Sequence, residues 1–191
     1  MTLQHNAISS PNPSVEFSRT ELSVAFEMFW RSLPKQGHVP NRRAFLPERA
    51  PRFLRDLVLC ELSLEGGSLA RIRLIGSALE ELIRRNLKGE DFLQYLPPAY
   101  HAGAVESVRE IVTRPCGLWQ VTPLHFERGF SQNFEFTALP LGPGTDGVHL
   151  LLVLTQALPG LVAPRPTVDQ VMVADTAIAY QYIDLGAGVP V

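Results

Sequence analysis

Five apolar-rich segments of this chain have the length and composition of β-strands, and residues 71–75 alternate charged and apolar residues as a strand with two different faces does. The five segments cover residues 57–64, 71–75, 118–126, 130–139 and 148–156. Short turn-forming sequences separate several of them, among them Glu65-Gly66-Gly67-Ser68 and Arg128-Gly129. Neighbouring strands that are joined by such short turns pair antiparallel. The pattern therefore predicts a five-stranded antiparallel sheet.

Apolar residues at helical spacing predict helices after the second strand. The clearest helix covers residues 99–113 and ends before Pro115, with one apolar face. Two shorter helical segments precede it, at residues 78–84 and 92–95. A capping box of Ser77 and Glu80 is expected to start the first segment, and Asp91 is expected to cap the second. A further short helix is predicted over residues 48–55.

The first predicted helix runs from a capping box at Ser18 and Glu21 to Leu33 and is stopped by Pro34. Its apolar stripe is wide and consists of Leu22, Ala25, Phe26, Phe29, Trp30 and Leu33. Both faces of the predicted strands are apolar, so this helix is expected to cover the second face of the sheet. Because the stripe exceeds what one sheet face covers, we also predict a homodimer interface made by Leu22, Phe26, Phe29 and Trp30.

Together these elements predict an α+β domain, with a five-stranded antiparallel sheet, helices on one face and the N-terminal helix on the other. We expect residues 1–17 to form a disordered arm, 18–47 the N-terminal helix and loop, 48–158 the sheet domain and 159–191 a C-terminal extension. Within the extension, the near-helical spacing of apolar residues predicts a helix over residues 168–182. Its valine and threonine content leaves a strand as the alternative.

The amino-acid identities in residues 70–96 are more specific than their pattern of apolar and polar positions. R-x-R-L-I-G-x-x-L-E-x-L followed by L-x-G-x-D-F resembles a bacterial subfamily of small PAS-domain proteins, in which a strand reading RLxG leads into a helix and an LxG turn. Upstream, Trp30, Leu33-Pro34 and residues 39–47 resemble the segment that precedes the domain there. The sequence departs from that pattern by carrying Asn86 before the LxG turn and by showing no effector domain.

The resemblance spans residues 26–158. It implies a PAS-like fold for the sheet domain and a stand-alone sensory or interaction module that binds a small molecule or a signalling protein. It names no ligand and no cofactor. Two alternatives remain open: a small enzyme that uses a cysteine–histidine pair between helices and sheet, and a purely structural dimer. The enzyme is disfavoured because no nucleophile, base and orienting group form a recognisable arrangement.

Composition narrows the class of protein further. Hydrophobic residues make up 46% and charged residues 19% of the 191 residues, which excludes global disorder. The net charge is −2, and acidic residues dilute the two arginine-rich runs, so no nucleic-acid partner is expected. There is no apolar run of membrane-spanning length and no signal-peptide pattern at the start. Two cysteines, Cys60 and Cys116, fit a reduced, cytoplasmic protein.

Several literal motif matches lack the context that their chemistry needs. Residues 142–147 match G-x-G-x-x-G, but a strand instead of a helix follows, which favours a hairpin turn. Pro115-Cys116 lacks the second cysteine and the H-x-E partner of zinc deaminases, and the five histidines show no paired spacing, so no metal is predicted. The cysteine motif of flavin-binding PAS domains is absent.

A ligand site is predicted between the sheet and the helices. Phe134 and Phe136 lie two apart on one strand and therefore point the same way, with Leu152 or Leu154 expected beside them from the next strand. Tyr95, Tyr100 and His101 are expected to supply polar groups at the rim. Apolar walls with a few polar groups are typical of a small-molecule pocket. A filled core at the same place is the alternative.

Overall fold

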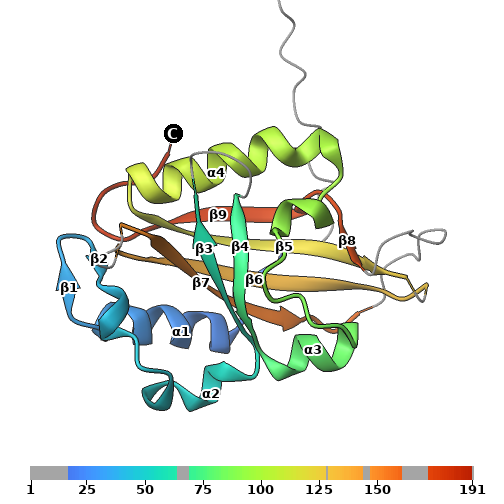
Figure 1. Ribbon diagram of the computed structural model, residues 1–191, viewed down its shortest axis with the longest axis horizontal. Helices are drawn as coiled ribbons and strands as arrows, with labels where there is room; N and C mark the ends of the chain where they lie inside the picture. Colours follow the sequence, from blue (N-terminus) through green and yellow to red (C-terminus); the bar gives the residue numbers. More distant parts are fainter. Residues whose placement is uncertain (1–16, 64–68, 128, 144–146, 161–171, 191) are drawn as a thin grey trace, which may run out of the picture.

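A single large antiparallel sheet organises the chain (Figure 1). The computed structural model describes residues 17–63, 69–127, 129–143, 147–160 and 172–190. Within them the strand order is β4-β3-β7-β6-β5, and both β8 and β9 lie beside β5. The strands are β3 (Leu57–Leu62), β4 (Ala70–Ile75), β5 (Cys116–Phe126), β6 (Ser131–Leu141), β7 (His149–Ala157), β8 (Met172–Ala174) and β9 (Ala179–Asp184). All five predicted strands are confirmed.

The C-terminal segment contributes strands to this sheet, so the predicted helix over residues 168–182 is wrong. Residues 168–171 lie outside the described residues, and the rest contains β8 and β9, which pair antiparallel with β5. β5 is eleven residues long and would otherwise leave a whole edge unpaired. The many β-branched and aromatic residues of the segment fit that edge better than a helix.

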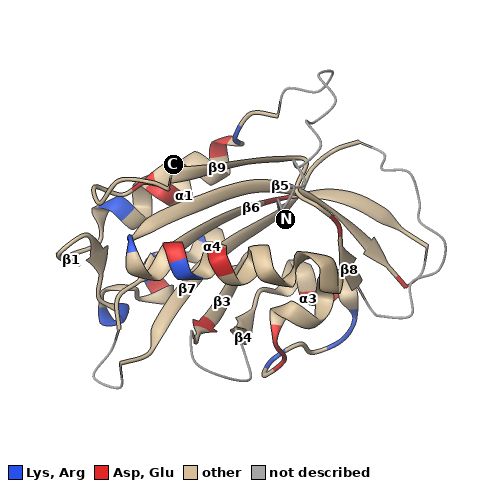
Figure 2. Ribbon diagram, turned by 90° about the horizontal axis from the view of Figure 1, so that it is seen from above, with Lys and Arg blue, Asp and Glu red and all other residues tan. Residues whose placement is uncertain are grey.

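Helices cover both faces of the sheet, as the sequence predicts. α1 (Glu21–Ser32) and α2 (Pro51–Leu54) cover one face, which we call the α1 face. α3 (Ser77–Ile83), the 3₁₀ turn η3 (Phe92–Tyr95) and α4 (His101–Thr113) cover the other, the α4 face (Figure 2). The remaining elements are a small hairpin of β1 (Lys35–Gln36) and β2 (Val39–Pro40) and the 3₁₀ turns η1 (Arg42–Ala44), η2 (Pro47–Arg49) and η4 (Pro98–Tyr100).

Each face of the sheet carries its own hydrophobic core. On the α1 face, Phe26 and Trp30 of α1 are fully buried against strand residues such as Leu139 and Leu152. On the α4 face, Ile111 of α4 and Tyr95 of η3 pack over the strands. Alternate side chains of each central strand therefore pack into two different cores. This explains why both sets of side chains are largely apolar in the sequence.

Hydrogen bonds hold α1 in place along its length. Thr20, and not Ser18, caps the helix, since its hydroxyl accepts from the backbone N–H of Ser23 at 3.1 Å. The buried carboxylate of Glu135 on β6 accepts from the backbone N–H of Thr20 at 3.0 Å and from Trp119 Nε1 at 2.6 Å. At the other end, Trp30 Nε1 donates to the carbonyl of Pro140 at 2.8 Å. These bonds satisfy polar groups that burial would otherwise penalise.

The turn from β4 into α3 differs from the expected capping box. The N-cap is Gly76, which has no side chain to cap the helix. The N–H of Ala78 in the first turn instead donates to the carbonyl of Arg55 at 2.9 Å. Arg84 adopts the left-handed conformation that ends the helix, with φ of 56°. Asp91 caps η3 as predicted, accepting from the N–H of Leu93 at 3.1 Å.

Three expectations fall wholly or partly outside the described residues: the arm over residues 1–17, of which 1–16 are not described, and the turns at 65–68 and 128–129. The G-x-G-x-x-G match lies between β6 and β7, which pair antiparallel, so the prediction of a hairpin connection is confirmed. No helix among the described residues has both the length and the apolar character needed to cross a membrane.

Candidate functional site

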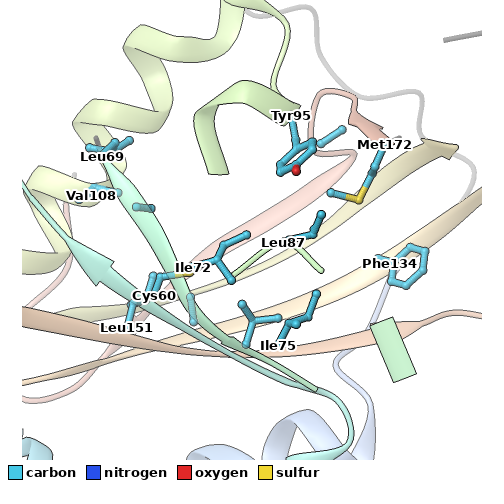
Figure 3. Packing of buried hydrophobic residues seen from close by; sticks show 14 of the residues in the cluster. Cys60, Leu69, Ile72, Ile75, Leu87, Tyr95, Val108, Phe134, Leu151 and Met172 are labelled. Atoms are coloured by element: carbon cyan, nitrogen blue, oxygen red, sulfur yellow. The ribbon is translucent and has the colours of Figure 1, made fainter. Parts of the chain in front are cut away.

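The centre of the α4 face is formed by β6, where Phe134 and Phe136 point toward the helices as predicted. Phe134 is 3% exposed, and its ring centroid lies 6.0 Å from that of Phe126 and 6.4 Å from that of Phe136. Figure 3 shows Phe134, Leu87, Tyr95 and Met172 directed into this shared core. The two phenylalanines therefore belong to a packed layer between sheet and helices.

Leu152 and Leu154 both lie on the opposite face, so the predicted place of either one beside the phenylalanines is wrong. Leu152 is directly opposite Leu139 and Leu154 is directly opposite Thr137, and both leucines are buried in the α1-face core. The register places Thr155 opposite Phe136 and Val153 opposite Ala138. Directly paired residues of antiparallel strands share a face. The apolar residues of β7 are continuous, so the sequence does not indicate whether its even-numbered or its odd-numbered side chains face α4.

The predicted rim residues do not form one group. Tyr95 is buried, and its hydroxyl donates to Glu90, whose carboxylate also pairs with Arg85 at 2.8 Å. Burial and the contact with the Glu90 carboxylate raise the pKa of Tyr95, so this phenol stays protonated at neutral pH. Tyr100 is 36% exposed at the surface, and His101 is half-buried with Nε2 donating to the carbonyl of Leu96 at 2.9 Å.

Two buried threonines that the sequence analysis did not single out complete the site. Thr122 is opposite Phe134 on β5, and Thr155 is opposite Phe136 on β7, so the four side chains form a block on the α4 face. The threonines are 3% and 5% exposed. Neither hydroxyl has a hydrogen-bond partner among the described residues. The sequence could have indicated them, because each strand next to β6 carries one threonine directly opposite a phenylalanine.

An unpartnered buried hydroxyl needs an explanation, because burying one without a hydrogen bond costs about 1–3 kcal/mol. Here two of them flank the same pair of aromatic rings. Among the described residues, Tyr95 is also buried on the α4 face, but its hydroxyl is bonded to Glu90, and the other buried polar or charged side chains lie on the α1 face or on α1 itself: Ser23, His125, Glu135 and Thr137. The α4 face thus offers two neutral hydrogen-bonding groups within an apolar layer.

The chemistry of the cysteines does not favour the enzyme alternative. Burial raises the pKa of the Cys60 thiol to about 12 and that of Cys116 to about 11. A nucleophilic cysteine needs a lowered pKa, because the thiolate is the reactive form. No group of three or more histidine, cysteine or acidic residues among the described residues is arranged to hold a metal ion.

The surface predicted for dimerisation is largely used within the chain. Phe26 and Trp30 are fully buried, and Leu22 and Phe29 are half-buried against the same core. Phe53 of α2 covers part of this surface. Its ring centroid lies 5.2 Å from that of Phe26 and 5.5 Å from that of Phe29. Phe26 and Trp30 therefore cannot contact a second copy in this arrangement, although the homodimer itself stays a prediction.

Comparison with known proteins agrees with this architecture. A family model described as PAS domain matches residues 19–154, from the residue before Thr20 to the middle of β7. No curated protein matches the chain. One similar solved structure is an RNA-binding light-oxygen-voltage receptor, with 15% sequence identity and a TM-score of 0.42 over 65% of this chain. The chain spans only 35% of that receptor's length. Because the family model covers more than half of the chain, the protein belongs to the PAS domain family.

Proposed function

We propose that this PAS domain is a sensory or interaction module that binds a small, neutral and mainly apolar molecule on the α4 face of its sheet. The proposal rests on the two buried hydroxyls of Thr122 and Thr155, which have no hydrogen-bond partner among the described residues. A ligand that hydrogen-bonds to them would remove the desolvation cost that the unliganded protein bears.

The surroundings limit the chemical class of the ligand. Aromatic and aliphatic side chains form the rest of the layer, so most of the ligand surface would be apolar. No buried charged side chain lies on this face among the described residues, and a buried ionic ligand without a counter-charge would be strongly disfavoured. A neutral molecule with one or two hydrogen-bonding atoms fits these conditions.

Native mass spectrometry of the purified protein tests the proposal. The parent protein is expected to retain a small molecule, and Thr122→Val and Thr155→Val should each weaken its retention about 2- to 12-fold, the value of one hydrogen bond. Thr137→Val is the matched control. This threonine is equally buried, but it lies on the α1 face and its hydroxyl is bonded to Ser23 Oγ at 2.6 Å.

The control should retain the small molecule like the parent protein. Equal losses in all three variants would indicate a general effect of threonine replacement. A parent protein that retains no molecule, and whose stability no compound of a neutral apolar library changes, would remove the proposed ligand site.

A further inference from the structure

Strand β9 forms one edge of the sheet and has a partner on one side only. It pairs with β5 through residues 179–184, and no other strand of the described residues lies along its outer side (Figure 1). Tyr180 is 61% exposed and Gln181 is exposed as well. An edge of this kind presents unpaired backbone N–H and C=O groups that can pair with another strand.

The hydrogen bonds of β5 show which residues of β9 face outward. Phe126 N donates to Phe130 O at 2.8 Å across the β5–β6 hairpin, so the even-numbered residues of β5 bond to β6. The odd-numbered ones bond to the other side, as seen where Ile178 N donates to Val121 O at 2.8 Å. Gln181 is opposite Trp119 and therefore directs its backbone groups inward, to β5.

The backbone groups of Tyr180 and Tyr182 consequently point away from the sheet. The carbonyl of Asp184, two residues further on, also points outward and accepts from Arg31 Nη2 at 2.7 Å. Beyond it the chain turns around the end of the sheet, since Leu185 packs on the α1 face and Val189 on the α4 face. The accessible edge is therefore the part of β9 centred on Gln181.

This part of the edge is self-complementary. Its sequence from Ala179 to Ile183 reads A-Y-Q-Y-I, which is nearly symmetric about Gln181. It contains no proline, lysine or arginine, which are common protections of an edge strand. The rings of Tyr180 and Tyr182 lie on the α4 face, 6.5 Å apart in an edge-on arrangement, where a paired strand would continue the aromatic row.

We propose that β9 pairs antiparallel with β9 of a second copy, about a two-fold axis at Gln181. In this register, Tyr180 of each copy is opposite Tyr182 of the other. Because the outward backbone groups belong to these tyrosines, each such pair forms two hydrogen bonds and the dimer forms four. Like side chains meet across the axis, which is the requirement of an isologous interface. The proposal does not depend on a ligand on the α4 face.

Substitution of Gln181 tests the register directly, because the axis places the two Gln181 side chains opposite each other. Light scattering at tens of micromolar should find a dimer for the parent protein. Gln181→Lys and Gln181→Glu should each raise the dimer dissociation constant about tenfold or more through like-charge repulsion. An equimolar mixture of the two variants should restore a heterodimer, detectable by native mass spectrometry. Gln181 is exposed, so folding of each variant should be unaffected.

Met28→Lys is the control. Met28 is 67% exposed on α1 and would lie in a dimer built on that helix. The proposal predicts that this variant dimerises like the parent protein. A monomeric parent protein, a dimeric Gln181→Lys variant, or a mixture of the two charged variants that stays monomeric would overturn the β9 pairing. Dissociation by Met28→Lys alone would assign the dimer to α1 instead.

Discussion

Gly76 occupies a point where two backbone segments touch. A Cβ atom at this residue would lie 2.3 Å from the carbonyl oxygen of Arg55 and 2.6 Å from that of Leu54. Its φ of −73° is open to any residue, so the requirement for glycine comes from this contact and not from backbone strain. The contact matters for the site, because the turn at Gly76 places α3 over the α4 face.

We therefore expect Gly76→Ala to lower the free energy of unfolding by about 2–4 kcal/mol, since the backbone of residues 54 and 55 must move to admit a methyl group. Gly103→Ala is the control. It is an exposed position in α4 with nothing within 4 Å of the added atom, so the change should raise stability by about 0.5–1 kcal/mol. Urea unfolding measures both. Similar values for the two variants would contradict the close approach at Gly76.

Single residues also show where a pattern of apolar and polar positions stops being informative. Phe134 and Phe136 share one face of the sheet, as their spacing predicts, because the single residue Glu135 separates them. The side on which Leu152 lies was predicted wrongly, because β7 is apolar on both sides and either alternate set fits the pattern. The side was decided by its pairing with Leu139, a contact between distant parts of the sequence. Thr122 and Thr155 become notable only when the structure shows that their hydroxyls lack partners.

At the scale of elements, α1 carries a charged group near its middle. Glu27 accepts from Arg31 Nε at 2.7 Å and pairs with Arg19, which also donates to the carbonyl of Ser23 at 3.1 Å. Burial alone would raise the pKa of Glu27, but the two arginines outweigh it and lower the pKa below 4.5. The ionised carboxylate thus ties the residue before the N-cap to the body of the helix.

The lowered pKa predicts the pH dependence of this contribution. A carboxyl group with a depressed pKa in the folded state stabilises the fold above its unfolded-state pKa and loses that effect as the pH falls. Glu27→Gln should therefore reduce stability by about 0.5–1 kcal/mol at pH 7, the range for partly exposed ion pairs. The difference from the parent protein should shrink below pH 4.5 and vanish once the pH is below the folded-state pKa. Urea unfolding from pH 7 to 3 measures it, and a constant difference would refute the assignment.

The C-terminal strands illustrate why an element can escape prediction from sequence. Apolar residues over 168–182 recur at near-helical spacing, which favoured a helix. The β-propensity of the segment favours strands instead. The choice depends on whether a sheet edge is available for these strands, and that edge is the side of β5 that does not pair with β6. The central strands needed no such information, because their alternation and short turns specify neighbours directly.

At the scale of the whole molecule, the sheet separates two sets of buried polar groups. On the α1 face, the polar groups of Glu135 and Thr137 bond to α1 and its N-terminal end, while His125 Nε2 and Asn133 Oδ1 have no hydrogen-bond partner among the described residues. On the α4 face, two neutral hydroxyls have no hydrogen-bond partner within the part of the chain that the structure describes. The predicted location of the site, between sheet and helices, followed from the resemblance to PAS domains. The polar groups at this location were not predicted. The sequence analysis expects tyrosine and histidine side chains at a rim, whereas the structure has threonines within the strands.

The proposed ligand site requires that the hydroxyls of Thr122 and Thr155 lower the stability of the unliganded protein. The unfolding free energy of a Thr122→Val, Thr155→Val double variant, measured on protein refolded without bound small molecules, tests this most directly. Removing two unpartnered buried hydroxyls at nearly constant volume should raise the unfolding free energy by about 2–6 kcal/mol, twice the cost of one such hydroxyl. A fall of similar size would contradict the account, because it would show that both hydroxyls have partners that hold the fold together.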